Sequence, residues 1–95
     1  MLFVAMCIDK PAHVDLRMST RPAHLAFLKR FENQVKLGGP LLDAAGQSAI
    51  GSLLIIEGED EGSARALLAQ DPYAQAKLFE RVELFPWKHV VGAQL

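Results

Sequence analysis

His24 is the residue of this sequence whose type and position best suit acid–base chemistry. Residues at helical spacing from it are Leu28, Phe31 and Val35, so its imidazole shares the apolar face of a predicted helix. We place His24 in the first turn of that helix, where the positive end of the helix dipole disfavours imidazolium. A neutral imidazole can accept a proton, as a general base must. A buried or capping histidine without a catalytic role fits the same pattern.

Asp71 is the candidate partner for this histidine. It follows Leu67 and Leu68 at helical spacing, near the end of a second predicted helix. A carboxylate is unfavourable at the C-terminal end of a helix, which suggests a role in a site. Asp71 followed by Pro72 is also the pattern of an N-cap and a first-turn proline for the next helical turn, and capping alone would explain it. One carboxylate oxygen could cap that turn while the other orients His24.

Two further side chains could contact a ligand. Arg21 lies near the same predicted helix start as His24 and could bind an anionic group, although a solvated arginine fits as well. Tyr73 could present its hydroxyl to a pocket, or could simply be buried as an amphipathic ring. Together these residue types would support proton transfer on a small molecule.

The other histidines and the single cysteine indicate neither a metal site nor a disulfide. His13 and His89 lack paired-ligand spacing, so we expect surface or packing roles for them. Cys7 lies in an apolar run without a partner for an intrachain disulfide, and we interpret it as a buried inert thiol rather than a nucleophile. The sequence has no phosphate loop and no GxSxG, CxxC or HExxH motif, so we expect no metal and no cofactor.

Composition restricts the chain to one small globular domain. Its 95 residues are 51% hydrophobic and 22% charged, with a formal net charge of −1. Lys and Arg are scattered rather than gathered in a stripe, which argues against nucleic acid as a partner. No run approaches the roughly 18 apolar residues of a membrane span, and the apolar run Leu2–Ile8 is too short for a signal peptide. We therefore expect a cytoplasmic protein that makes no membrane contact.

The elements that must position these residues follow the order strand, helix, strand, strand, helix, strand. In chain order they are predicted as a strand over Leu2–Ile8, a helix from Ser19 or Thr20 to about Leu37 with Pro22 in its first turn, a short strand over 39–43, a strand over Ile50–Glu57, a helix ending near Asp71, a helical turn over Tyr73–Leu78 and a strand over Phe79–His89. This order is typical of a ferredoxin-like α+β sandwich with an antiparallel sheet. The first and third strands are apolar throughout and should be central, whereas the second and fourth carry Gly, Pro and charges and should be edges.

The strand pattern also predicts a homodimer. In this sandwich the helices cover one face of the sheet, and strands with one wet face should alternate apolar and polar residues. Leu2–Ile8 and Leu53–Ile56 do not alternate, so the second face also needs cover. A second copy of the sheet is the economical cover, although a monomer that tolerates some exposed apolar residues is the alternative.

Short motifs spread along the whole chain resemble those of the YciI-like (YCII-related) proteins. The matching segments are, in order, Met1-Leu2-Phe3-Val4, Asp9-Lys10, Arg21-Pro22-Ala23-His24-Leu25, Gly39-Pro40-Leu41, Gly51-Ser52 and Asp71-Pro72-Tyr73, followed by Val82 and Pro86. The resemblance implies a ferredoxin-like dimeric α/β barrel with a proposed active site on a histidine and an aspartate, which correspond to His24 and Asp71. We add Arg21, Tyr73 and Ser52 as candidate substrate-binding residues.

The resemblance also implies a small enzyme that needs no cofactor, because one branch of the family is similar to dehydrochlorinases of chlorinated hydroxyquinols. The expected reaction is elimination or hydrolysis on a small molecule, an aromatic one being the candidate, with His24 as the acid–base group and Asp71 orienting it. A non-catalytic small-ligand-binding or assembly module of the same fold is the alternative. Two departures bear on pocket shape: Lys77 stands where many members have glycine, and the loop over 43–49 is short.

Overall fold

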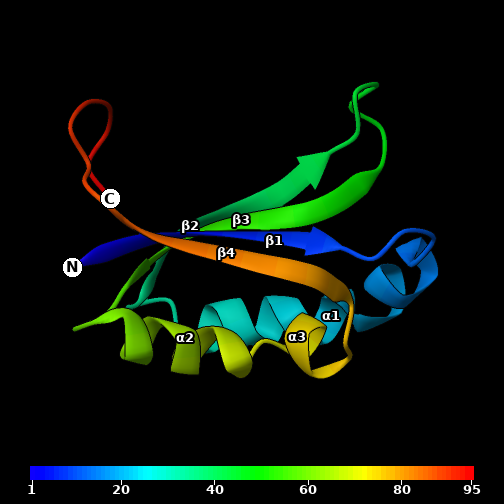
Figure 1. Cartoon of the computed structure of the whole chain (residues 1–95), viewed down its shortest axis with the longest axis horizontal. Coiled ribbons are helices and arrows are strands. Elements are labelled where there is room, and N and C mark those ends of the chain that lie inside the picture. Colours follow the sequence, from blue (N-terminus) through cyan, green and yellow to red (C-terminus); the bar gives the residue numbers. More distant parts are fainter.

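Four antiparallel strands form one sheet, and three helices cover one of its two faces (Figure 1). The computed structural model describes all 95 residues. The elements are β1 (Leu2–Asp9), α1 (Val14–Arg30), β2 (Val35–Leu42), β3 (Ala49–Glu57), α2 (Glu61–Ala69), α3 (Pro72–Gln75) and β4 (Phe79–Trp87). The strand order is β2-β3-β1-β4, so the predicted ferredoxin-like α+β sandwich and its two central strands are confirmed. None of the helices combines the length and the apolar character needed to cross a membrane.

The hydrophobic core lies between the sheet and the helices. Along β1, alternate side chains point to the helices, and Phe3, Ala5 and Cys7 are each at most 1% exposed. They pack with Leu54 and Ile56 of β3, since neighbouring strands present paired residues to the same face. The helices contribute Phe27, Ala64, Leu67 and Leu68 to this cluster. The sheet thus provides a rigid base on which α1 and α3 meet.

Helix α1 begins at Val14, earlier than the predicted start at residues 19–20. Pro22 lies inside the helix rather than in its first turn. Proline removes one backbone N–H from the helical ladder, but Pro22 and Met18, whose carbonyl loses that partner, are both exposed, so water can replace the bond. His24 is therefore about three turns into α1. The expectation that the helix dipole keeps this imidazole neutral was wrong, because the dipole acts within the first turn.

Helix α1 also ends early, at Arg30 rather than near Leu37. The carbonyl of Phe31 accepts the backbone N–H of Val35 at 2.9 Å, and β2 begins at Val35, earlier than the predicted short strand over 39–43. Phe31 and Val35 still pack against the core, one from a turn and the other from an edge strand. Their spacing resembled a helix because both conformations direct them to the same core. Pairing with the backbone of β3 decides in favour of the strand.

The backbone of Lys77 explains one departure from the family pattern. This residue follows α3 with φ of 60°, in the left-handed region that glycine adopts without Cβ repulsion. Its N–H donates to the carbonyl of Ala74 at 3.0 Å and closes the end of α3. The Lys77 side chain is exposed. Having lysine instead of glycine at this position therefore raises the energy of the backbone.

Replacing Lys77 with glycine should raise the free energy of unfolding by about 0.5–1 kcal/mol. Loss of the Cβ relieves about 1–2 kcal/mol of left-handed strain, and the greater freedom of glycine in the unfolded chain offsets part of that gain. Urea denaturation followed by circular dichroism measures the change. Lys77→Ala keeps the Cβ and is the matched control, expected to stay within about 0.5 kcal/mol of the parent. A glycine variant no more stable than the parent would contradict the strain.

Candidate active site

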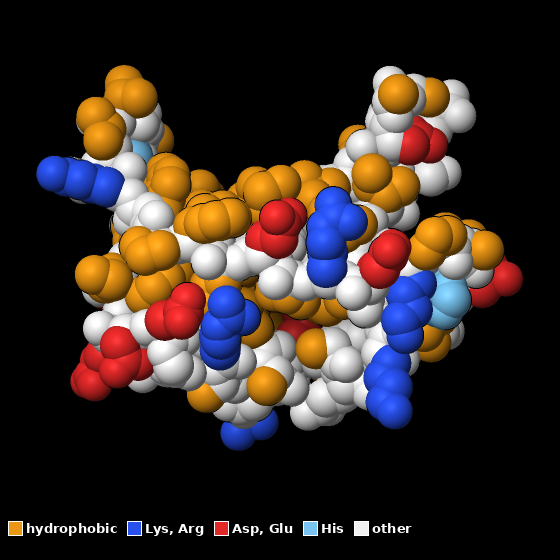
Figure 2. Space-filling model, viewed as in Figure 1, with side chains coloured by type: hydrophobic (Ala, Val, Ile, Leu, Met, Phe, Trp, Pro, Cys, Tyr) orange, Lys and Arg blue, Asp and Glu red, His pale blue; other side chains and the backbone are white.

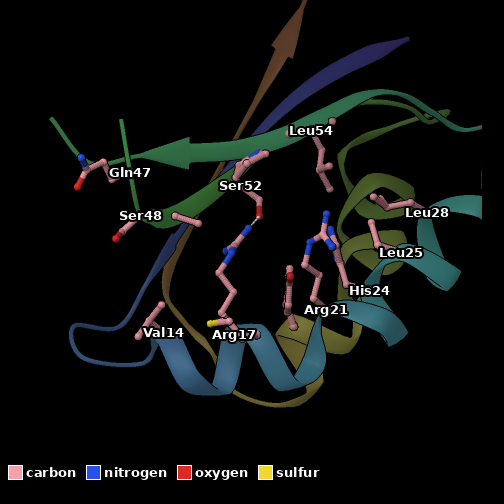
Figure 3. Close-up of a pocket in the computed structure, with 16 residues that line it drawn as sticks. Val14, Arg17, Arg21, His24, Leu25, Leu28, Gln47, Ser48, Ser52 and Leu54 are labelled. Carbon is pink, nitrogen blue, oxygen red and sulfur yellow. Dashed lines mark hydrogen bonds between the residues drawn. The ribbon is translucent and has the colours of Figure 1, made fainter. Parts of the chain in front are cut away.

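A pocket of about 450 Å³ opens between α1 and the helix-facing side of β2 and β3 (Figure 3). This volume lies in the range of small-molecule sites. The lining residues come from α1 (Val14, Arg17, Met18, Arg21, His24, Leu25, Leu28), from β2 (Gly38, Gly39, Pro40), from the β2–β3 loop and β3 (Gln47, Ser48, Ala49, Ser52, Leu54) and from α3 (Tyr73). The short loop noted in the sequence therefore borders the pocket, whereas Lys77 does not.

His24 and Asp71 form a buried hydrogen bond at this pocket. His24 Nδ1 lies 2.8 Å from Asp71 Oδ1, and the two residues are only 6% and 1% exposed. An ionised carboxylate can only accept, so Nδ1 donates and Nε2 of the neutral imidazole keeps its lone pair. Such an imidazole can take up a proton at Nε2. The carboxylate beside Nδ1 would stabilise the resulting imidazolium.

The same oxygen of Asp71 caps helix α3. Oδ1 accepts the backbone N–H of Tyr73 at 2.9 Å, and Pro72 is the first residue of the helix. Capping and orientation of the histidine, which we expected to fall on different oxygens, are combined at Oδ1. The other oxygen, Oδ2, is buried and has no hydrogen-bond partner. Because the cap fixes the carboxylate to α3, His24 bonds to an acceptor that cannot easily turn away.

The ring of Tyr73 packs against the imidazole. Its centroid lies 4.0 Å from that of the His24 ring, with 18° between the ring planes. Tyr73 is 1% exposed, and burial raises the pKa of its hydroxyl above the ordinary 10.0, although nearby Arg17 and Arg21 oppose that shift. The phenol is therefore protonated at neutral pH. No group of the chain hydrogen-bonds the hydroxyl, so it remains a free donor at the pocket.

Arg17 is a buried member of the site that our sequence analysis missed. It is 7% exposed, and its Nη1 lies 3.0 and 2.9 Å from the two carboxylate oxygens of Asp9. Nη2 donates to Ser52 Oγ at 2.7 Å, and the guanidinium carbon lies 4.7 Å from the Tyr73 ring centroid, within cation–π range. The spacing between Arg17 and His24 was the sequence signal that could have identified Arg17. Arg17 precedes His24 by about two helical turns and shares its face once α1 is extended to its true start.

Arg21 and Ser52, which were predicted to contact a ligand, both line the pocket, but they differ in exposure and in hydrogen bonding. Ser52 is 2% exposed and its hydroxyl accepts from Arg17, so it positions that guanidinium. Arg21 is exposed and lines the opening from α1. The structure thus brings His24, Asp71 and Tyr73 into direct contact and places Arg21 and Ser52 around the same cavity.

The other two histidines lie away from this pocket. His13 Nδ1 donates to the carbonyl of Pro11 at 2.8 Å, just before α1. His89 stacks on Trp87 after β4, with ring centroids 5.8 Å apart. No three His, Cys, Asp or Glu side chains of the chain lie close enough together to hold a metal ion.

Comparison with known proteins gives these residues a family context. The YCII-related domain matches residues 1–88. Protein YciI of Escherichia coli is 35% identical over 97 residues, which cover 95% of this chain and 99% of that protein. The 5-chloro-2-hydroxyhydroquinone dehydrochlorinase of Burkholderia phenoliruptrix, solved with 2,5-dihydroxybenzoquinone, superposes with a TM-score of 0.88 at 32% identity, over 95% of this chain and 96% of that one. An antibiotic biosynthesis monooxygenase, 14% identical with a TM-score of 0.55 over 96% of this chain and all of its own, shares the fold alone.

Cys7 lies on β1 behind the site and is 1% exposed. Burial raises the pKa of its thiol from 9.0 to about 12, and the nearby charges of Asp71 and Asp9 add to the shift while Arg17 opposes it. The thiolate is the reactive form of cysteine, so this environment suppresses nucleophilic chemistry.

Iodoacetamide should therefore modify native protein near pH 8 at least about 100-fold more slowly than protein unfolded in guanidinium chloride, because three pKa units separate the native thiol from an ordinary one. Mass spectrometry at timed intervals measures both rates. The unfolded sample is the internal control, since Cys7 is the single cysteine and should react completely. Native and unfolded rates within tenfold of each other would contradict an inert thiol.

Proposed function

The chain belongs to the YCII-related domain family, and on this premise we propose that it is a small cofactor-independent enzyme with His24 as its acid–base group. The observation that carries the proposal is the buried hydrogen bond from His24 to Asp71 beside a pocket of small-molecule size. That bond holds the hydrogen of the imidazole on Nδ1 and leaves Nε2 available for proton transfer. The substrate class that we propose is a small aromatic molecule.

Elimination is the reaction that such a site would support. Nε2 of His24 would take a proton from the substrate, and the electron pair of the broken bond would form a new double bond. The leaving group would depart with its own bonding pair. Asp71 would stabilise the imidazolium until its proton passes to water or to the departing anion, which restores the base. Hydrolysis would use the same base on a water molecule.

The Burkholderia relative supports elimination as the reaction class. Its name describes dehydrochlorination of 5-chloro-2-hydroxyhydroquinone, and its complex holds 2,5-dihydroxybenzoquinone. The two chains are 32% identical over 95% of this one, and their folds superpose closely. A chlorinated hydroquinone is therefore the first substrate to test with this protein.

We further propose that the protein works as a homodimer through the open face of the sheet. The strand registers place Leu37, Ile55, Val4 and Phe85 in one apolar row across all four strands. Leu37 and Phe85 at the two ends of the row are 51% and 52% exposed. Figure 2 shows hydrophobic side chains gathered along this side, between two raised parts of the molecule. No helix covers the row, so a second copy of the sheet is the occupant that we propose.

Asp71→Asn and His24→Gln should each lower turnover of 5-chloro-2-hydroxyhydroquinone by about 100-fold or more, the usual contribution of general acid–base catalysis. If this compound is not turned over, the substrate comes from a thermal-shift screen of small phenols. Asparagine can still cap α3 through its amide oxygen, so Asp71→Asn should change the free energy of unfolding by no more than about 1 kcal/mol. His13→Gln alters a histidine outside the pocket and is the matched control, expected to keep full activity.

Turnover that survives both substitutions would contradict the acid–base role. A wild-type protein that binds screened ligands but turns none of them over would instead favour a small-ligand-binding module.

For the dimer, light scattering at micromolar concentration should report about twice the 10.4 kDa mass of the chain. Phe85→Glu places a charge in the apolar row, so it should give a monomer of lower melting temperature, because the monomer lacks the cover of its partner. Ala66→Glu adds the same charge on the exposed side of α2 and should stay dimeric. A monomeric parent protein, or a Phe85→Glu variant that stays dimeric, would refute this assembly.

A further inference from the structure

The pocket presents cations and hydrogen-bond donors, while the carboxylates of the site lie behind them. None of the lining residues is Asp or Glu, whereas Arg17, Arg21 and His24 all line the cavity. Asp9 and Asp71 each bind one of these side chains, Asp9 the guanidinium of Arg17 and Asp71 the imidazole of His24. Asp9 thereby matches the charge of Arg17, while Asp71 stays behind the imidazole and outside the pocket lining.

Arg21 is the cation of this pocket that has no ion-pair partner. Its guanidinium makes no ion pair and no hydrogen bond with the rest of the chain, and the pocket lining offers no acid to it. Figure 3 shows the side chain rising from α1 into the space beneath β3. His24 lies one helical turn further along the same face of α1. A guanidinium in this place offers planar, paired N–H donors that match the oxygens of an anion.

Tyr73 supplies a second donor to the same space. The ring is almost fully buried, but the hydroxyl has no partner in the chain and its oxygen remains accessible where the residue lines the pocket. An accessible phenol hydroxyl can donate to an acceptor in the cavity, so a ligand oxygen there would have a donor to meet. Arg21 and Tyr73 could therefore contact one ligand oxygen or two neighbouring ones.

The opposite wall of the pocket suits a flat molecule. β2 contributes Gly38, Gly39 and Pro40 there, none of which has a long side chain. A Cβ added at Gly38 would lie 2.7 Å from Leu54 Cδ2, so the Leu54 side chain, which also lines the pocket, would have to shift. Leu28 and Leu54 add apolar surface for a ring.

We infer that the pocket takes a planar small molecule that carries an ionised oxygen, with Arg21 as its counter-charge and the Tyr73 hydroxyl as a second donor. The inference rests on the proposed function, because it names the substrate class of the same pocket. The ionised group would be a carboxylate or an acidic phenol or enol. A neutral ring of the same shape would make the apolar contacts and lose the ionic one.

Calorimetric titration with a matched ligand pair tests this assignment. The pair is 2,5-dihydroxybenzoquinone, which is ionised at neutral pH, and its neutral dimethyl ether, 2,5-dimethoxybenzoquinone. The parent protein should bind the ionised ligand about tenfold more tightly, as a charge-assisted contact predicts. Tyr73→Phe keeps the ring and should lower affinity for the ionised ligand about threefold.

Arg21→Gln should abolish the preference for the ionised ligand and change affinity for the neutral one less than about twofold. Arg21→Lys keeps the charge and should retain part of the preference. Lys29→Gln removes the same charge from an exposed position of α1 outside the pocket, and it should retain the whole preference. Thermal melts verify that every variant is folded.

Equal losses for both ligands in Arg21→Gln, or the same loss in Lys29→Gln, would overturn the inference. Absence of binding of both ligands by the parent protein at millimolar concentration would overturn it too. Calorimetry requires no turnover, so the two proposals fail separately. Unchanged turnover in His24→Gln refutes the acid–base role alone, whereas a ligand preference that Arg21→Gln retains refutes the substrate class alone.

Discussion

The buried hydrogen bond between His24 and Asp71 is the contact on which the geometry of the site depends. It joins the middle of α1 to the residue that starts α3. Asp71 Oδ1 also caps α3 and so places Tyr73, whose ring stacks on the same imidazole. The cap positions the carboxylate, the carboxylate fixes the imidazole tautomer, and the phenol ring limits imidazole rotation. Each side chain is therefore held by the other two, which keeps the imidazole in one orientation.

The ion pair of Arg17 and Asp9 supports this arrangement from the other end of the pocket. This ion pair joins the start of α1 to the end of β1, and the hydrogen bond from Arg17 to Ser52 connects both to β3. Both charged side chains are less than one-tenth exposed, and removing one partner of such a pair typically costs about 3–5 kcal/mol because the other charge is left buried. The contact therefore belongs to the fold as much as to the site. It also leaves Arg21 as the unmatched cation of the cavity.

Much of the architecture is local information, and the sequence predicted it. The apolar runs of β1 and β3 require burial on a sheet, and the Gly, Pro and charges of β2 and β4 are tolerated at edges, so element order and strand positions were predictable. Helical spacing placed His24 on the apolar face of its helix. The Asp-Pro pair indicated the cap of α3, which the structure confirms.

The limits of α1 and the internal arrangement of the site were decided only in three dimensions. The sequence by itself determined which residues are apolar, which can cap and which can transfer a proton. It could not determine that α1 ends at Arg30, because the competing partner is the edge of β3, a strand distant in sequence. For the same reason Arg17 escaped notice: its partners Asp9 and Ser52 become neighbours only when β1, β3 and α1 pack together. The spacing of residues in the sequence predicts which face of an element a side chain occupies. Its partner on that face depends on contacts between residues that are far apart in the sequence.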